Sequence, residues 1–266
     1  MNIKPIAYIK TDFKEKFGIP RQSGLIENIY GEIVFEKQFR HPDALRGIEE
    51  YSHLWLIFDF SQNHRDEFSP TVRPPRLGGN TRVGVFATRS PFRPNNLGLS
   101  CVKLEKIKFD ENLGHTIIVS GVDLLDNTPI YDIKPYIPYC DCKPQAKGSF
   151  GEELKDCKIE VFYNEKIFES IDNDEKNAII SIIEQNPIPA YKSEEKEYKF
   201  LFSKYEICFK ISQNKAEILK IENIWFKRGY LPKYPLNFCY FFKFKLLKMW
   251  ITYAILYVTI LLIYNI

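Results

Sequence analysis

The sequence predicts a mainly β protein: an N-terminal β-barrel, a smaller C-terminal α+β domain and an extra hydrophobic C-terminal tail. Short runs of β-branched and aromatic residues follow one another through the first 150 residues, separated by Gly and Pro rather than by helical patterns. With 266 residues, 45% hydrophobic and 27% charged, the chain has the composition of one large or two small globular domains. This composition excludes a wholly disordered chain.

The barrel is predicted over residues 1–145. A short helix is predicted at Pro42–Gly47, because Pro fits a first helical turn and Gly a C-terminal stop. Many short strands without helices between them can protect their edges by closing into a barrel. The predicted strands are Ile3–Ile9, Gly31–Phe35, Ser52–Phe60, Arg82–Thr88, Leu99–Phe109, His115–Leu124 and Thr128–Tyr136.

The α+β domain is predicted over residues 151–224, after a linker at Asp141–Glu152 that contains Pro and Gly. A helix is predicted at Asp174–Gln185, where apolar residues recur at helical spacing before Pro187 ends the pattern. The predicted strands of this domain are Cys157–Tyr163, Lys199–Phe202, Tyr205–Ile211 and Ala216–Ile221.

The tail, residues 225–266, changes character again. Its run Met249–Tyr264 is apolar or aromatic and uncharged over 16 residues, shorter than the ~20 residues that span a bilayer. Three interpretations stay open: a membrane anchor, an extension read past a lost stop codon or in a shifted frame, and a packed helix. An anchor would place Lys243, Lys245 and Lys248 on the cytoplasmic side.

The N-terminus and the cysteines indicate a cytoplasmic protein. The first ten residues contain no uninterrupted apolar segment of the kind a signal peptide needs. The six cysteines form no C-x-x-C pair, so reduced, buried thiols are expected and no metal site is predicted.

Arginines gather in one stretch of the chain. Five of the ten arginines lie between positions 73 and 93, and residues 68–104 contain no Asp or Glu. A net charge of only +3 means that any basic surface must be local. Guanidinium groups bind phosphate or carboxylate through two parallel hydrogen bonds and stack on bases, and the neighbouring prolines hold the backbone in place. The stretch predicts an anion-binding face, the alternative being a solvated surface with scattered internal pairs.

Two other segments offer polar groups. Pro20-Arg21-Gln22 provides a guanidinium and an amide in a constrained loop, or forms a structural turn. The segment Asp123–Pro129 ends a predicted strand, so its carboxylates could meet a ribose hydroxyl or an ammonium group. The alternative for Asp126 is an Asx-turn. The chain has neither a G-x-G-x-x-G nor a P-loop motif, which disfavours the usual nucleotide sites.

Asp132, Lys134 and Tyr136 alternate along a predicted strand and therefore share one face of it. Three polar groups on one barrel strand could supply general acid–base chemistry. A salt bridge at the barrel rim beside a packed tyrosine explains the same residue types.

These segments, in this order, resemble the TsaA-like (TrmO/YaeB-like) family of S-adenosylmethionine-dependent tRNA N6-methyltransferases. The resemblance covers about residues 3–224, and its Arg-rich motifs are highly specific. The tail has no recognised counterpart. The matching runs are Phe17-Gly-Ile-Pro-Arg-Gln22, Gly47-Ile-Glu-Glu-Tyr-Ser-His-Leu-Trp55, Pro70-Thr-Val-Arg-Pro-Pro-Arg-Leu-Gly-Gly-Asn80, Val83-Gly-Val-Phe-Ala-Thr-Arg-Ser-Pro-Phe-Arg-Pro-Asn95, Leu124–Pro129, Asp132–Tyr136 and Asn186–Tyr191, the last with Asn186 and Ile188 where Asp and Arg are usual.

The resemblance implies methylation of N6 of threonylcarbamoyladenosine beside the anticodon of a tRNA, on a β-barrel rather than a Rossmann sheet. It also implies a homodimer with the cofactor near the subunit interface. Ser61 departs from the family, which usually has His there. Carried over by position, the cofactor contacts would be Pro20, Arg21, Gln22, Ser61, Gln62, Arg89, Leu99, Ser120, Gly121, Val122 and Asp123.

A mechanism follows as a hypothesis. N6 of the modified base is a poor nucleophile until its ureido proton leaves, so Asp132 or Tyr136 would accept that proton, with Lys134 favouring the ionised form. Arg73, Arg76 or Arg93 would bind the threonyl carboxylate, the remaining arginines would hold tRNA phosphates, and an aromatic such as Phe92 would stack on a base. The competing functions are a non-catalytic RNA-binding barrel, a methyltransferase with another small acidic substrate, and a membrane-tethered adaptor.

Overall fold

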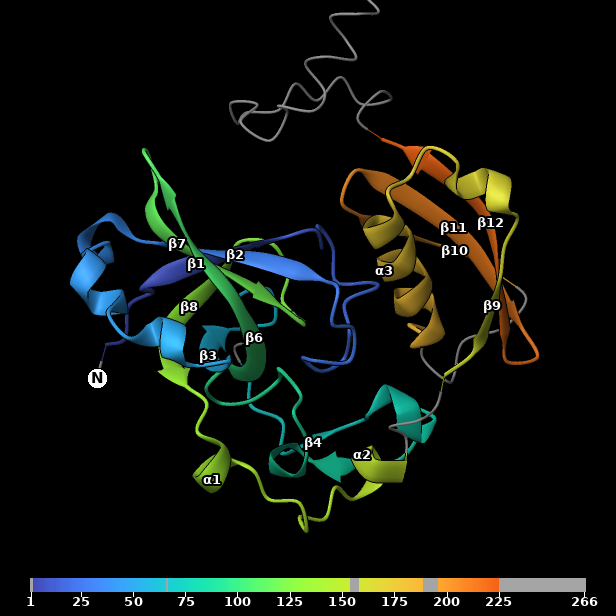
Figure 1. The fold of residues 1–266 in the computed structure, drawn as a ribbon. Coiled ribbons are helices and arrows are strands. Elements are labelled where there is room, and N and C mark those ends of the chain that lie inside the picture. Colours follow the sequence, from blue (N-terminus) through green and yellow to red (C-terminus); the bar gives the residue numbers. More distant parts are fainter. Residues whose placement is uncertain (1, 66, 154–157, 189–195, 225–266) are drawn as a thin grey trace, which may run out of the picture. The chain divides into compact units, whose positions relative to one another are not determined.

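Six antiparallel strands close into a barrel in the order β1-β2-β7-β6-β3-β8 (Figure 1). The computed structural model describes residues 2–65, 67–153, 158–188 and 196–224, so the three interpretations of the tail lie outside the described residues. The closed sheet confirms the predicted barrel. Its strands are β1 (Ala7–Thr11), β2 (Tyr30–Phe35), β3 (His53–Asp59), β6 (Leu97–Asp110), β7 (Gly114–Ser120) and β8 (Thr128–Pro135).

The alternation of side chains along each strand builds the barrel core. On β3, Leu54, Leu56 and Phe58 are buried, while Trp55 and Ile57 between them face the other side. β8 pairs with β3 so that Lys134 lies opposite Trp55 and Asp132 opposite Ile57. Ile9, Ile33, Val102, Ile117 and Ile130 complete the interior from the other strands.

The predicted strand Arg82–Thr88 is wrong. Only β5 (Val83–Gly84) is extended there, and it pairs with β4 (Thr71–Val72) in a separate two-stranded ribbon. Val85–Ala87 then forms a 3-10 turn that ends where the Thr88 amide donates to the Val85 carbonyl. Residues 60–96, the whole segment between β3 and β6, are called here the arginine-rich connection.

Three other elements begin or end at different residues from those predicted. The strand predicted to run to Leu124 ends at Ser120, because Gly121 has a φ of 71° that no strand residue adopts. The first strand begins at Ala7 rather than at Ile3. The helix predicted at Pro42–Gly47 is a 3-10 helix over Pro42–Leu45.

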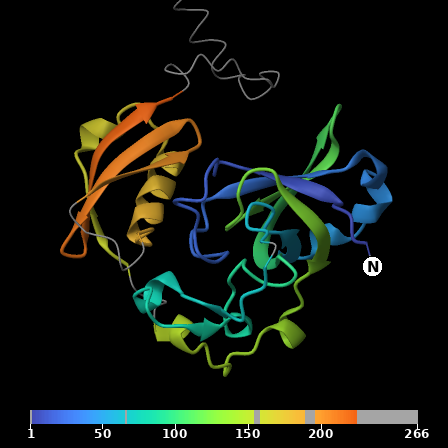
Figure 2. The ribbon, with the colours of Figure 1, turned by 180° about the vertical axis from the view of Figure 1, so that it is seen from behind.

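The C-terminal part has the predicted α+β composition. A four-stranded sheet has the order β10-β11-β12-β9, formed by Glu197–Phe202, Tyr205–Ser212, Lys215–Asn223 and Glu160–Phe162. Helix α3 (Asn173–Glu184) lies against one face of this sheet in both views (Figures 1 and 2). Asp172 caps α3 by accepting from the Asp174 amide. The buried face of α3 is the predicted one: Ala178, Ile179, Ile182 and Ile183.

Two short helices lie at the two ends of the predicted linker: α1 (Pro138–Asp141) ends where it begins, and α2 (Phe150–Glu153) overlaps its last residues. The described cysteines carry free thiols, but Cys140 and Cys142 are exposed rather than buried. Within the described ranges, no helix is long and apolar enough to cross a membrane.

The segment after β1 is held by the C-terminal sheet. The rings of Phe13 and Phe202 lie 5.5 Å apart, and the Ser203 amide donates to the Asp12 carbonyl. Gly18 has a φ of 95°, and a Cβ there would lie 2.9 Å from the Phe200 ring. Only glycine both adopts this positive φ and leaves room for the Phe200 ring. The contacts of this segment with the C-terminal sheet therefore position the loop that carries Pro20, Arg21 and Gln22.

Gly98 tests how tightly β3 and β6 pack. It pairs with Phe58, and a Cβ on Gly98 would lie 2.2 Å from the Phe58 ring. Gly98→Ala is therefore expected to lower the free energy of unfolding by about 1–3 kcal/mol, because Phe58 has to leave its place. Urea denaturation measures this. Gly84→Ala is the control, since nothing lies within 4 Å of the added Cβ. Equal stability of the two variants would contradict the packing argument.

Candidate active site

A cavity of about 390 Å³ opens at one end of the barrel. Its volume falls within the ~300–1,000 Å³ range of small-molecule sites. The ends of β3 and β6, the loop after β1, the arginine-rich connection and the β7–β8 connection all contribute. The lining residues are 16, 19–22, 58–63, 89, 91, 93, 97–100, 123–125 and 128.

Most residues expected to contact the cofactor come together here. Eight of the eleven line the cavity: Pro20, Arg21, Gln22, Ser61, Gln62, Arg89, Leu99 and Asp123. The other three, Ser120, Gly121 and Val122, do not line it. The Ser120 hydroxyl donates to Glu105 at 2.6 Å, and the Gly121 amide donates to the Ile29 carbonyl. These three residues therefore support the wall that carries Asp123.

Among the described residues, Asp123 is one of two carboxylates that line the cavity, and it is half-buried. Ser100 Oγ donates to it at 2.6 Å, and the Ser23 amide also donates to it. Burial raises the pKa of Asp123 to about 6, and the hydrogen bonds and the charge of Arg89 oppose this rise only in part. A bound cation would favour the ionised form, so the site is suited to a ligand with positive charge.

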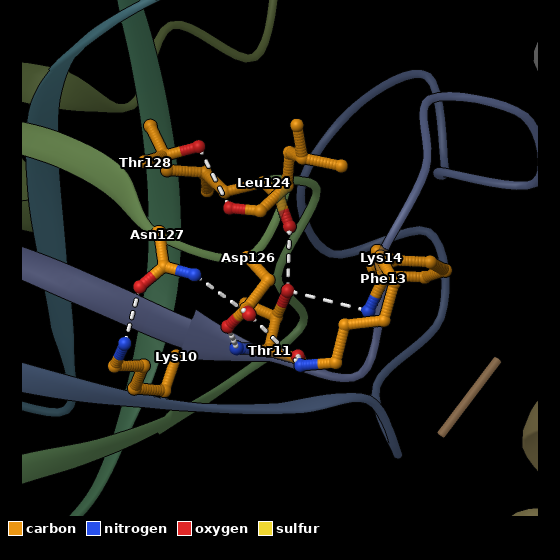
Figure 3. A network of polar contacts seen from close by, with 9 residues as sticks. Lys10, Thr11, Phe13, Lys14, Leu124, Asp126, Asn127 and Thr128 are labelled. Carbon is orange, nitrogen blue, oxygen red and sulfur yellow. Dashed lines mark hydrogen bonds and ion pairs between the residues drawn. The ribbon is translucent and has the colours of Figure 1, made fainter. Parts of the chain in front are cut away.

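The loop that carries Asp123 is anchored by a polar network (Figure 3). Asp126 accepts from the Thr11 amide at 3.0 Å and pairs with Lys14 at 2.9 Å. Thr11 Oγ1 donates to the Leu124 carbonyl at 3.0 Å, next to the cavity wall. Asp126 does not line the cavity, so the structure places it as an anchor of its turn.

Three guanidinium groups reach the cavity. Arg89 donates to Gln22 Oε1, and Arg21 donates to the Asn186 carbonyl. Arg93 donates to the carbonyls of Thr88 at 2.9 Å and Ser90 at 3.3 Å, which fixes its position in its own loop. Each group is thus pre-positioned by a hydrogen-bond partner.

Only part of the predicted anion-binding stretch reaches the cavity. Arg89 and Arg93 line the cavity, whereas Arg73 and Arg82 do not. Arg82 donates to Thr71 Oγ1 across the β4–β5 ribbon at 3.0 Å. The side chain of Arg76 lies outside the described part of the structure. Arg73 and Arg82 adjoin the paired strands of the β4–β5 ribbon, whose pairing sequence spacing does not reveal.

Asp132, Lys134 and Tyr136 do not line the cavity. Their positions opposite Ile57 and Trp55 place Asp132 and Lys134 on the outer face of the barrel wall. Asp132 and Lys134 form an ion pair at 2.9 Å, and the Tyr136 ring packs 5.7 Å from that of Trp55. The structure thus matches the alternative, a salt bridge beside a packed tyrosine.

The sequence analysis missed a second carboxylate of the cavity. Asp59, only 9% exposed, lines it at the end of β3 and accepts from His64 Nε2 at 2.7 Å. The Tyr131 hydroxyl donates to the same carboxylate, and burial together with that charge raises the pKa of Tyr131. In the neutral tautomer in which Nε2 carries the hydrogen, Nδ1 of His64 has the lone pair. No motif marks this pair; only the chain reversal after β3 brings it together.

Comparison with known proteins gives a consistent result. Residues 8–142 match the family described as "tRNA-methyltransferase O N-terminal domain", and residues 157–224 match "TrmO C-terminal domain". A tRNA (adenine(37)-N6)-methyltransferase of Escherichia coli is 35% identical over 226 residues, covering 82% of this chain and 96% of the relative.

Two further similarities concern Pseudomonas aeruginosa. A putative S-adenosylmethionine-dependent methyltransferase, RcsF, is 48% identical over 151 residues, which are 57% of this chain and 61% of the relative. The crystal structure of TrmO from the same organism superposes with a TM-score of 0.68 at 29% identity, covering 84% of this chain and 97% of that one.

Proposed function

Because the chain belongs to the tRNA-methyltransferase O family, it is a tRNA methyltransferase that uses S-adenosylmethionine, and we propose that it methylates N6 of threonylcarbamoyladenosine beside the anticodon. The observation that carries this proposal is the cavity in which Gln22, Arg89 and Asp123 meet although they are far apart in sequence. A homodimer and a cytoplasmic location stay predictions of the same proposal.

The cavity fits the methyl donor in chemistry as well as in size. S-adenosylmethionine supplies an electrophilic methyl group on a positively charged sulfur, beside an amino acid and an adenosine moiety. Asp123 would balance positive charge, and Arg21 or Arg89 would bind a carboxylate. Leu99, Leu124 and Phe58 provide apolar surface for a base. Ser61 lines the cavity in place of the usual histidine, so a contact there uses the hydroxyl or the main chain.

The substrate carries a carboxylate on its threonyl group. Arg93 lines the cavity and presents a guanidinium whose loop is already fixed, so it is the group we assign to that carboxylate. Arg73, exposed on the arginine-rich connection, is assigned to tRNA phosphates. Arg76 is retained as a second candidate for either contact.

We assign proton removal from N6 to His64, oriented by Asp59. The proton would move to Nδ1 of His64 as the new N–C bond forms and the methyl–sulfur bond breaks, its electron pair staying on the sulfur, and Asp59 would stabilise the resulting imidazolium. Asp59 lines the cavity 2.7 Å from Nε2, whereas His64 itself is exposed and is not among the lining residues, so the assignment rests on its pairing with Asp59. Asp132 and Tyr136 remain the alternative proton acceptors, and Lys134 their partner, to be compared with His64 by mutation.

Methyl incorporation into purified tRNA tests the proposal. We expect tRNA with the threonylcarbamoyl group to be methylated at least about 100-fold faster than the same tRNA without it, because a site built for a polar group rejects a substrate that lacks it. Nucleoside mass spectrometry identifies the methylated position. Equal incorporation into both would overturn the carboxylate contact, and no incorporation into either would overturn the substrate assignment.

A further inference from the structure

Two aromatic rings lie exposed on the arginine-rich connection. Phe68 is 56% exposed and Phe86 is 73% exposed, and their rings stack with centroids 6.5 Å apart and planes 26° apart. Exposed rings gathered in one place, rather than scattered singly, commonly mark an interaction surface. The stacked pair therefore has two broad apolar rings available to a partner.

The backbone beneath Phe86 holds this pair in place. Val85, the residue before Phe86, is buried, and its amide donates to the Pro70 carbonyl at 3.0 Å. The Thr88 amide donates back to the Val85 carbonyl at 3.2 Å and closes the 3-10 turn. Val85 thus packs into the core, whereas the Phe86 side chain is exposed and is not needed for packing.

The charge around the rings indicates the kind of partner. The Arg93 guanidinium lies 6.0 Å from the centre of the Phe86 ring and also lines the cavity, so it links the ring pair to the candidate active site. Arg73 and Arg82 lie on the same connection, and residues 68–93 contain no carboxylate side chain. Aromatic rings flanked by guanidinium groups are the groups that bind unpaired bases and their phosphates.

The ring expected from the sequence to stack on a base is not available for it. The Arg65 guanidinium covers the Phe92 ring at 3.6 Å from its centre. The exposed rings are instead those of Phe68 and Phe86, which the sequence analysis did not single out.

We propose that Phe68 and Phe86 form a stacking platform for an unpaired base of the tRNA, next to the nucleotide that enters the cavity. This inference rests on the proposed function and adds the surface that positions the RNA. Arg82 contributes charge on the same connection, held in place by its bond to Thr71. A second copy of the chain is disfavoured as the occupant, because two such surfaces would bring arginines of like charge together.

The test compares tRNA affinity and cofactor affinity in the full-length protein. Phe68→Ala and Phe86→Ala are each expected to weaken tRNA binding by about tenfold, measured by fluorescence anisotropy, and to leave the calorimetric affinity for S-adenosylmethionine unchanged. Phe86→Trp, which keeps an aromatic ring at this position, is expected to bind tRNA as tightly as the wild type. Phe109→Ala is the matched control: Phe109 is 65% exposed on β6, packs against His115 and should not affect either affinity.

Three other experimental outcomes would each contradict a different part of the proposal. Unchanged tRNA affinity in both alanine variants, with a wild-type protein that still methylates tRNA, removes the platform and leaves the proposed function intact. A wild-type protein that neither binds nor methylates tRNA removes the proposed function and the platform with it. Dissociation of a dimer by Phe86→Ala in sedimentation analysis would assign this surface to a contact between copies and overturn the proposal.

Discussion

Asp59→Asn is expected to lower the rate of methyl transfer at saturating substrates by about 100-fold, the usual size of a general-base contribution. The asparagine amide can donate to His64 where the carboxylate accepts, so Nδ1 would carry the hydrogen and could no longer take the proton from N6. The affinity for tRNA and for the cofactor should change little, because the role of Asp59 is to orient His64 across 2.7 Å.

His64→Ala should lower the rate by a similar factor, and the double variant should be no slower than either single one, because the two residues act as a unit. Added imidazole should restore part of the activity of His64→Ala but not of a protein that is merely misfolded. Asp132→Asn and Tyr136→Phe are the controls, since both residues lie away from the cavity. A larger loss of rate in either control than in Asp59→Asn would return the proton acceptor to β8.

Asp123→Asn is expected to weaken S-adenosylmethionine binding by about 2 kcal/mol, or roughly 30-fold, because the cavity loses the negative charge of this carboxylate. The fold should not suffer: Asn keeps the shape of Asp and can still accept from Ser100. Titration calorimetry measures the affinity. Wild-type affinity in Asp123→Asn would contradict the role of Asp123 in balancing the positive charge of the cofactor.

The stability of the protein should change with pH in a way that identifies the same residue. Burial raises the pKa of Asp123 from 3.8 to about 6, so the folded chain binds this proton more tightly than the unfolded chain. The free energy of unfolding therefore falls as pH rises from about 4 to above 6, by about 3 kcal/mol in all from this group. Urea denaturation at several pH values should show this slope in the wild type and in Asp132→Asn but not in Asp123→Asn.

The pattern of apolar residues was sufficient to predict the barrel strands and α3, because alternation and helical spacing report which faces can be buried. Leu54, Leu56 and Phe58 on β3 and the apolar face of α3 are buried as the periodicity predicts. The pattern failed at Arg82–Thr88, where the residue types suit a strand but local hydrogen bonds form a two-residue pair and a 3-10 turn.

For the site too, the sequence pattern predicted local features, and the tertiary structure decided where they lie. Alternation placed Asp132 and Lys134 on one face of a strand, but it does not distinguish the inside of a barrel from the outside. The Asp59–His64 pair and the exposed Phe68–Phe86 rings carry no motif, since they depend on how the arginine-rich connection folds back.

By itself, the sequence determined the class of fold and, through its family motifs, many of the residues that line the cavity. Tertiary structure alone decided which charged side chains face that cavity: Arg89 and Arg93 but not Arg82, and Asp59, which no motif marks, but not Asp132. The physical reason is that residue spacing sets local periodicity, whereas the closure of the barrel and the long-range contacts of its loops set which side chains meet.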